Sequence, residues 1–262
     1  MTRKSTSTVI VGIDGSQASL HAAQWAVDEA LSRDLPLRLI YVTKPKHPSP
    51  DDYYEDVHRG RAALEHAATT VEALGKPVKV ETAVLDGPST PTLIEQSSDA
   101  DMVCVGTVGI GRYAQSILGS TAAELAEKAH CPVAVIRPPE GDAKPTDWIV
   151  VALGKDPDDE VVVDHAMREA ELRRAPVLVL GDSAGRDDLD ERIAGWRDKY
   201  PQVHVYPLAD ESDVTEFLKK HHERVQLAVV GTGQAGDLTK IVGPHGHPVF
   251  HHTHSSALVV RS

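Results

Sequence analysis

The sequence predicts an α/β fold with two tandem domains, each built on a doubly wound parallel sheet. Two observations carry this prediction. Along the 262-residue chain, short runs of Val, Ile and Leu alternate with longer amphipathic segments, a pattern typical of parallel strands covered by helices on both faces. The chain also repeats itself, because residues 148–154 align with 8–14 and residues 168–176 align with 28–36. An internal repeat of this length indicates two copies of one domain.

The rest of the repeat defines the domain limits. Residues 226–233 align with 101–108 and residues 258–261 with 134–137, so the offset falls from 140 to about 125 and the second copy lacks about fifteen residues in its middle. The segment 138–145 (PPEGDAKP) is rich in Pro, Gly and charge and is expected to be a linker. We therefore place the domains at 1–138 and 146–262.

The elements of the first copy follow from its apolar pattern. A strand is expected over 9–12, a second over 37–42 and a third over 102–105, and a helix is expected over 18–33 and again over 121–131. Asp14, Val42 and Gly106 lie at the ends of these three strands. Because ligands of doubly wound sheets bind beyond the carboxyl ends of the strands, we expect these residues to share one crevice.

Glycines and hydroxyls follow the third strand in a pattern suited to phosphate. Gly106 and Gly109 have no Cβ to keep a triphosphate from the backbone. After nine intervening residues, Gly119, Ser120 and Thr121 offer N–H groups and hydroxyls where a helix begins. A tight turn without a ligand is the alternative explanation of the glycines, and the full spacing favours phosphate over it. Threonines at such places are often only helix caps.

This spacing, G-x2-G-x9-G-S, resembles the ATP-binding signature of the universal stress protein family, and residues 9–16 (VIVGIDGS) resemble its first strand. The resemblance covers nearly the whole chain. It implies a fold of the universal stress protein and adenine nucleotide hydrolase type, and a nucleotide-responsive regulatory role in stress. The implied ligand is ATP, with Mg²⁺ or Mn²⁺ as an accompanying cation. The implied binding residues are Gly12, Ile13, Asp14, Val42, Gly106, Thr107, Val108, Gly109, Ile110, Gly111, Arg112, Gly119, Ser120 and Thr121.

The resemblance places Asp14 at the nucleoside and the backbone of Val42 near the base. A carboxylate is repelled by a triphosphate but accepts hydrogen bonds from an amine or ribose hydroxyls, which favours the same assignment. In the second copy Gly154 stands where the aspartate would be, and Pro244 has no N–H to offer an anion. We expect the second domain to keep the fold without binding ATP.

Composition limits the partners. The formal charge of −12 argues against nucleic acid, which needs a basic face. No apolar run approaches the roughly 20 residues that span a membrane, and the N-terminal residues lack a signal-peptide core. The two cysteines, Cys104 and Cys131, make no disulfide framework. We expect a cytoplasmic protein that forms a homodimer and acts on a regulatory protein partner.

Three other segments suggest chemistry and are weighed against simpler explanations. The first, residues 245–254, has five histidines and could bind a metal ion, but their spacing matches no zinc motif and a solvated loop is the simpler explanation. Residues 181–185 (GDSAG) have the form of a hydrolase nucleophile elbow, yet the repeat equates them with an ordinary strand end. Residues 49–56 are expected to form an acidic loop, with a lid over the nucleotide as the alternative. The histidines are His245, His247, His251, His252 and His254.

No efficient catalytic activity is expected. The chain has no G-x4-G-K-[ST] motif, and no histidine or carboxylate pair stands beside the glycine loop to activate water. A slow ATPase or autophosphorylating enzyme is one alternative to the regulatory role. The other is a dimerisation protein without a ligand, in which the glycine loop is a relic.

Overall fold

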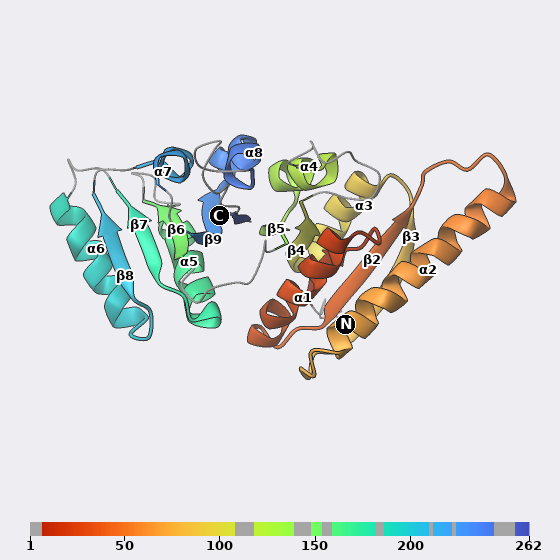
Figure 1. Cartoon of the computed structure of the whole chain (residues 1–262), viewed down its shortest axis with the longest axis horizontal. Helices are drawn as coiled ribbons and strands as arrows, with labels where there is room; N and C mark the ends of the chain where they lie inside the picture. Colours follow the sequence, from red (N-terminus) through yellow and green to blue (C-terminus); the bar gives the residue numbers. More distant parts are fainter. Residues whose placement is uncertain are drawn as a thin grey trace, which may run out of the picture. The chain divides into compact units, whose positions relative to one another are not determined.

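A computed structural model describes residues 7–107, 118–138, 148–153, 159–181, 186–209, 212–221, 224–243 and 255–261. The chain divides into two compact units, Met1–Pro138 and Pro139–Ser262. Both are α/β units with parallel sheets (Figure 1). Among the described residues, no helix is long and apolar enough to cross a membrane.

The first unit alternates strands and helices along the chain. Its sheet has the order β3-β2-β1-β4-β5, and each of the four pairings is parallel. The chain thus winds outward from β1 to β3, then returns to β4 beside β1, which makes the sheet doubly wound. The elements are β1 (Thr8–Gly12), α1 (Gln17–Ser32), β2 (Leu37–Thr43), α2 (Pro50–Glu72), β3 (Val80–Asp86), α3 (Ser89–Gln96), the 3₁₀ turn η1 (Ser97–Asp99), β4 (Ala100–Gly106), α4 (Ser120–Lys128) and β5 (Val133–Ile136).

The second unit repeats this plan with the order β10-β9-β6-β7-β8, again with parallel pairings. Its second helix is shorter, with 14 residues in α6 against 23 in α2. The elements are β6 (Trp148–Ala152), α5 (Asp159–Arg173), β7 (Val177–Leu180), α6 (Arg186–Lys199), β8 (Val205–Leu208), α7 (Val214–Lys220), β9 (Val225–Gly231), the 3₁₀ turn η3 (Thr232–Asp237), α8 (Leu238–Ile241) and β10 (Ser256–Val260).

The middle residues of the central strands β1 and β4 are buried beneath the helices that cover the sheet. In the first unit α1 packs against α2 and α3 packs against α4, and α1 lies on β1 and β4. Cys104 and Cys131 are both buried and form no disulfide. The continuous Val, Ile and Leu runs are therefore those expected of parallel strands.

The first helix of each unit, α1 and α5, carries a buried ion pair at the corresponding position. Glu29 is completely buried and lies 2.5 Å from Nη1 of Arg33. Glu169, 140 residues later, is also buried and lies 3.0 Å from Nη2 of Arg173. The residue after each arginine has a positive φ, 54° at Asp34 and 52° at Arg174, so both helices end in the same left-handed turn.

Candidate functional site

Three strand ends of the first unit meet at one edge of the sheet. The strands β2, β1 and β4 are neighbours and parallel, so their carboxyl ends lie side by side. Ile13 continues the pairing beyond β1, because its N–H donates to Ile40 O at 2.8 Å. The next residue, Asp14, is exposed, while Val42 and Gly106 are half-buried. The sheet reverses its winding between β1 and β4, so this edge is the topological switch point.

Asp14 stands in the turn that starts α1. Its Oδ1 accepts a hydrogen bond of 2.9 Å from the N–H of Ser16, whose own Oγ caps the helix by accepting from Ser19 N–H. Gly15 has a φ of 83°, which favours glycine. The turn therefore fixes where the exposed carboxylate stands at the sheet edge.

The structure gives a packing reason for glycine at position 106. A Cβ built on Gly106 would lie 2.6 Å from the backbone carbon of Ala18 in α1. The missing side chain is thus required by the close approach of α1 to β4, a reason that the sequence did not reveal. A Cβ on Gly12 would meet Val105 and Leu93 at 3.2 and 3.3 Å, which is also a packing limit.

The residues on either side of the glycine loop are joined to each other. Thr107 is buried, and its carbonyl accepts a hydrogen bond of 2.7 Å from the N–H of Gly119. Gly119 is the N-cap of α4 and provides no side-chain cap, so the helix begins at Ser120 with its first N–H groups available to an anion. Thr121 follows, and its Oγ1 accepts a hydrogen bond of 3.2 Å from Thr90 in α3.

The remaining predicted residues of the loop, Val108, Gly109, Ile110, Gly111 and Arg112, lie outside the described residues. The structure does bring Gly12, Ile13, Asp14 and Val42 to the same sheet edge as Gly106 and Thr107. The α4 residues Gly119, Ser120 and Thr121 join them through the Gly119–Thr107 hydrogen bond.

The expected acidic loop over residues 49–56 is wrong, because most of it is helical. Ser49 is the N-cap of α2, its Oγ accepting from Asp52 N–H, and Pro50 is the first helical residue. Asp51 and Asp52 occupy the first turn, where carboxylates are stabilised by the helix dipole. The acidic residues that follow Pro50 therefore mark the start of a helix and not a loop.

Asp56 is a buried carboxylate that sequence reasoning missed. Its Oδ1 accepts from Tyr41 OH at 2.9 Å, and its Oδ2 accepts from Lys44 N–H at 2.8 Å and lies 2.9 Å from His47 Nε2. Burial alone favours the protonated acid, but these hydrogen bonds outweigh it, so the pKa of Asp56 is lowered. Burial and the bond to Asp56 raise the pKa of Tyr41 to about 12. The network ties β2, the connection after it and α2 together.

A second polar set lies at the ends of β2 and β3. Thr43 Oγ1 donates to Asp86 Oδ1 at 2.8 Å, and Tyr53 OH lies 3.3 and 3.4 Å from the two oxygens of Asp86. The charge of Asp86 raises the pKa of Tyr53. Asp86 could be recognised from sequence only as an acid that ends a strand, immediately before a glycine.

At the corresponding edge of the second unit, a turn and a helix follow the strand directly. After β9, the η3 turn and α8 place Leu238, Ile241 and Val242 in fully buried positions. Gly154 and Pro244 lie outside the described residues, as do Ser183 and the five histidines. Gly181 continues the strand pairing of β7 by donating its N–H to Leu208 O at 2.9 Å.

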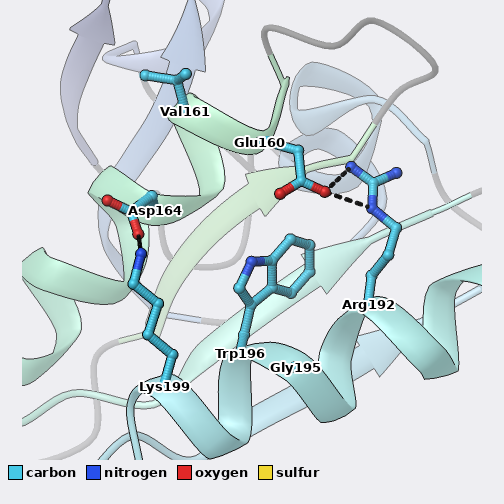
Figure 2. A pocket seen from close by; sticks show the side chains of 7 residues that line it. All are labelled: Glu160, Val161, Asp164, Arg192, Gly195, Trp196 and Lys199. Atoms are coloured by element: carbon cyan, nitrogen blue, oxygen red, sulfur yellow. Dashed lines mark hydrogen bonds and ion pairs between the residues drawn. The ribbon is translucent and has the colours of Figure 1, made fainter.

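A groove of about 530 Å³ lies between α5 and α6 of the second unit (Figure 2). Trp196 forms its floor between two ion pairs: Arg192 binds Glu160 at 3.1 Å, and Lys199 binds Asp164. The charged side chains that line the groove are thus used to bridge the two helices. We therefore assign it no ligand.

Comparison with known proteins identifies relatives over the full chain. The sequence model of the Universal stress protein family matches residues 6–137. A universal stress protein of Mycobacterium tuberculosis H37Rv is 53% identical over 261 residues, covering 97% of this chain and 96% of the relative. The crystal structure of a universal stress protein from Archaeoglobus fulgidus DSM 4304 covers 98% of this chain and 96% of its own, with a TM-score of 0.71 and 13% identity. A universal stress protein solved in complex with cAMP matches half of this chain, with a TM-score of 0.42 and 26% identity.

Proposed function

Since this chain belongs to the universal stress protein family, we propose that its first unit binds ATP and that the chain acts as a nucleotide-responsive regulatory module in a stress response. The observation that carries the proposal is the meeting of three strand ends with the uncapped start of α4 at the switch point of one sheet. Nucleotides bind at such edges because backbone N–H groups and the helix dipole attract phosphate there.

The order of the strands suggests how the nucleotide lies. The phosphates belong at β4 and α4, where Gly119 and Ser120 start a helix without a side-chain cap. The exposed carboxylate of Asp14, at the end of β1, suits the ribose hydroxyls, which are hydrogen-bond donors. The base then lies over the end of β2, beside Val42. Arg112 and a Mg²⁺ or Mn²⁺ ion would neutralise the triphosphate.

The second unit is proposed to have no nucleotide site. Leu238 and Ile241 are fully buried in α8, which follows the strand that corresponds to β4. In the sequence, Gly154 stands where the aspartate of the first unit is, and Pro244 has no N–H to offer a phosphate. A homodimer, a regulatory protein partner and a cytoplasmic location remain predictions of the same proposal.

The proposal is tested by measuring the nucleotide that the protein carries and binds. Freshly purified protein is denatured, the released nucleotide is quantified by ion exchange, and ATP binding with magnesium is then measured by calorimetry. We expect about one ATP per chain, as for one site, and its loss in Gly109→Glu. The matched control is Gly233→Glu in η3, where an added Cβ meets no atom within 4 Å. Binding lost equally in both variants, or absent from the native protein, would contradict the proposal.

A further inference from the structure

Asp86 occupies the end of the strand next to the expected position of the base. In register, Thr43 of β2 pairs with Asp86 of β3, and Asp14 follows β1 on the other side of β2. Neighbouring strands lie about 4.8 Å apart, so the ends of β1 and β3 are separated by roughly 10 Å. A carboxylate therefore stands on each side of the strand end over which the base is proposed to lie.

The hydrogen bonds of Asp86 direct its carboxylate toward β2. Thr43, which is buried, holds Oδ1 at 2.8 Å. Asp86 does not cap the following helix, since α3 has Pro88 as its N-cap and no side-chain cap. The φ of 136° at Gly87 turns the backbone sharply away after β3. The side chain is thus held over the strand ends instead of at the start of α3.

Among the described residues, the second hydrogen-bonding partner of the Asp86 carboxylate, Tyr53, binds it only weakly. The two contacts from Tyr53 OH, 3.3 and 3.4 Å, are longer than the 2.5–3.0 Å usual for such bonds. Asp86 is exposed. A donor on a ligand can therefore replace Tyr53 while Thr43 continues to hold the other oxygen.

The chemistry of the base then identifies the donor. With phosphates at α4, ribose at β1 and base at β2, the edge of the base that faces β3 is the one farthest from the ribose. In adenine this edge carries the exocyclic 6-amine, which donates hydrogen bonds. An ionised carboxylate can only accept hydrogen bonds, so the two groups are complementary. On the basis of the proposed ATP site, we propose that Asp86 is a specificity-determining residue that accepts a hydrogen bond from the 6-amine of the adenine base.

The test compares ATP with purine riboside triphosphate, which lacks the 6-amine, by calorimetry. A charge-assisted hydrogen bond makes the native protein bind ATP about tenfold or more tightly than the analogue. In Asp86→Ala this preference should disappear, because both ligands then meet the same site. Asp86→Asn keeps an acceptor oxygen for Thr43 and should show a smaller preference than the native protein. Asp51→Ala, which removes an exposed carboxylate from the first turn of α2, should keep the full preference.

The outcomes separate this inference from the proposed function. If the native protein binds ATP but prefers it equally in all variants, or shows no preference at all, Asp86 does not read the amine and only this inference fails. Loss of the preference in Asp51→Ala as well would also contradict it. If the native protein binds neither ligand, the ATP site itself is refuted.

Discussion

In the first unit β4 ends at a sheet edge beside an exposed carboxylate, Asp14, and the next helix, α4, begins at Ser120, whereas in the second unit the η3 turn follows β9 directly and α8 begins at Leu238. Elsewhere the units agree closely. Both have the register shift at the first residue of their first strand, at Thr8 and at Trp148. The scaffold thus depends on apolar strands and helix ends, and a ligand site depends on a few residues beyond them.

The largest expected effect tests whether the two scaffolds are equivalent. Arg33→Met and Arg173→Met each remove the guanidinium from a buried glutamate, and we expect each to lower the free energy of unfolding by about 3–5 kcal/mol. Urea denaturation followed by circular dichroism measures the loss. Lys128→Met, which breaks an exposed pair with Glu124, should cost less than about 1 kcal/mol. A large loss in only one unit would break the correspondence.

The next largest effect is a difference in stability between two glycine substitutions, one at the end of β4 and one at the end of β9. Gly106→Ala places a methyl group 2.6 Å from the backbone of Ala18, and we expect overpacking to cost about 1–3 kcal/mol. At the equivalent Gly231 an added Cβ lies 3.5 Å from Val162, an ordinary contact, so Gly231→Ala should change stability by less than about 0.5 kcal/mol. Thermal unfolding distinguishes the two. Equal melting temperatures for both variants would show that α1 yields to the added methyl group.

A smaller effect depends on pH. The side chain of Asp56 is 3% exposed and that of Asp164 19%, so Asp56→Asn should cost about 1–3 kcal/mol at pH 7 and Asp164→Asn less. The pKa of Asp56 is lowered from 3.8 by folding. Its contribution is therefore fully present above pH 3.8 and is lost as the pH falls through the lower folded value. Unfolding measured from pH 7 to pH 2 should show the native protein and Asp56→Asn converging in acid; a constant difference would contradict this assignment.

The smallest effect contrasts two glycines within helices. A Cβ on Gly60 of α2 would lie 2.4 Å from the ring of Tyr41, whereas a Cβ on Gly195 of α6 meets nothing within 4 Å. Gly195→Ala should therefore raise the free energy of unfolding by about 0.5–1 kcal/mol, while Gly60→Ala lowers it. Chemical denaturation gives both signs, and stabilisation by both variants would show that Tyr41 moves aside without loss.

The sequence was sufficient for several strands and helices of the first unit, but α2, β3 and α3 were not among its predictions. The apolar runs predicted strands over 9–12 and 37–42, and the structure has them at Thr8–Gly12 and Leu37–Thr43. The start of α2 was missed although Ser49, Pro50 and two aspartates form a helix start signal, because a cluster of prolines and acids was taken as a loop.

The site was less predictable because it depends on tertiary contacts. The repeat and the glycine spacing indicated which strand ends matter. They could not show that Gly106 is required by Ala18, nor that Asp56 is buried among Tyr41, Lys44 and His47. An acidic residue in the sequence carries no signal for burial, since burial is set by what packs on it.

The central claim, one nucleotide site in the first unit and none in the second, is tested most directly by amide hydrogen exchange with and without ATP and magnesium. We expect slower exchange in residues 12–16, 42–44 and 106–122 and unchanged exchange in residues 152–156 and 231–245, because a ligand that binds the native state suppresses local opening around its site. Protection in the second unit, or none in either, would contradict the account.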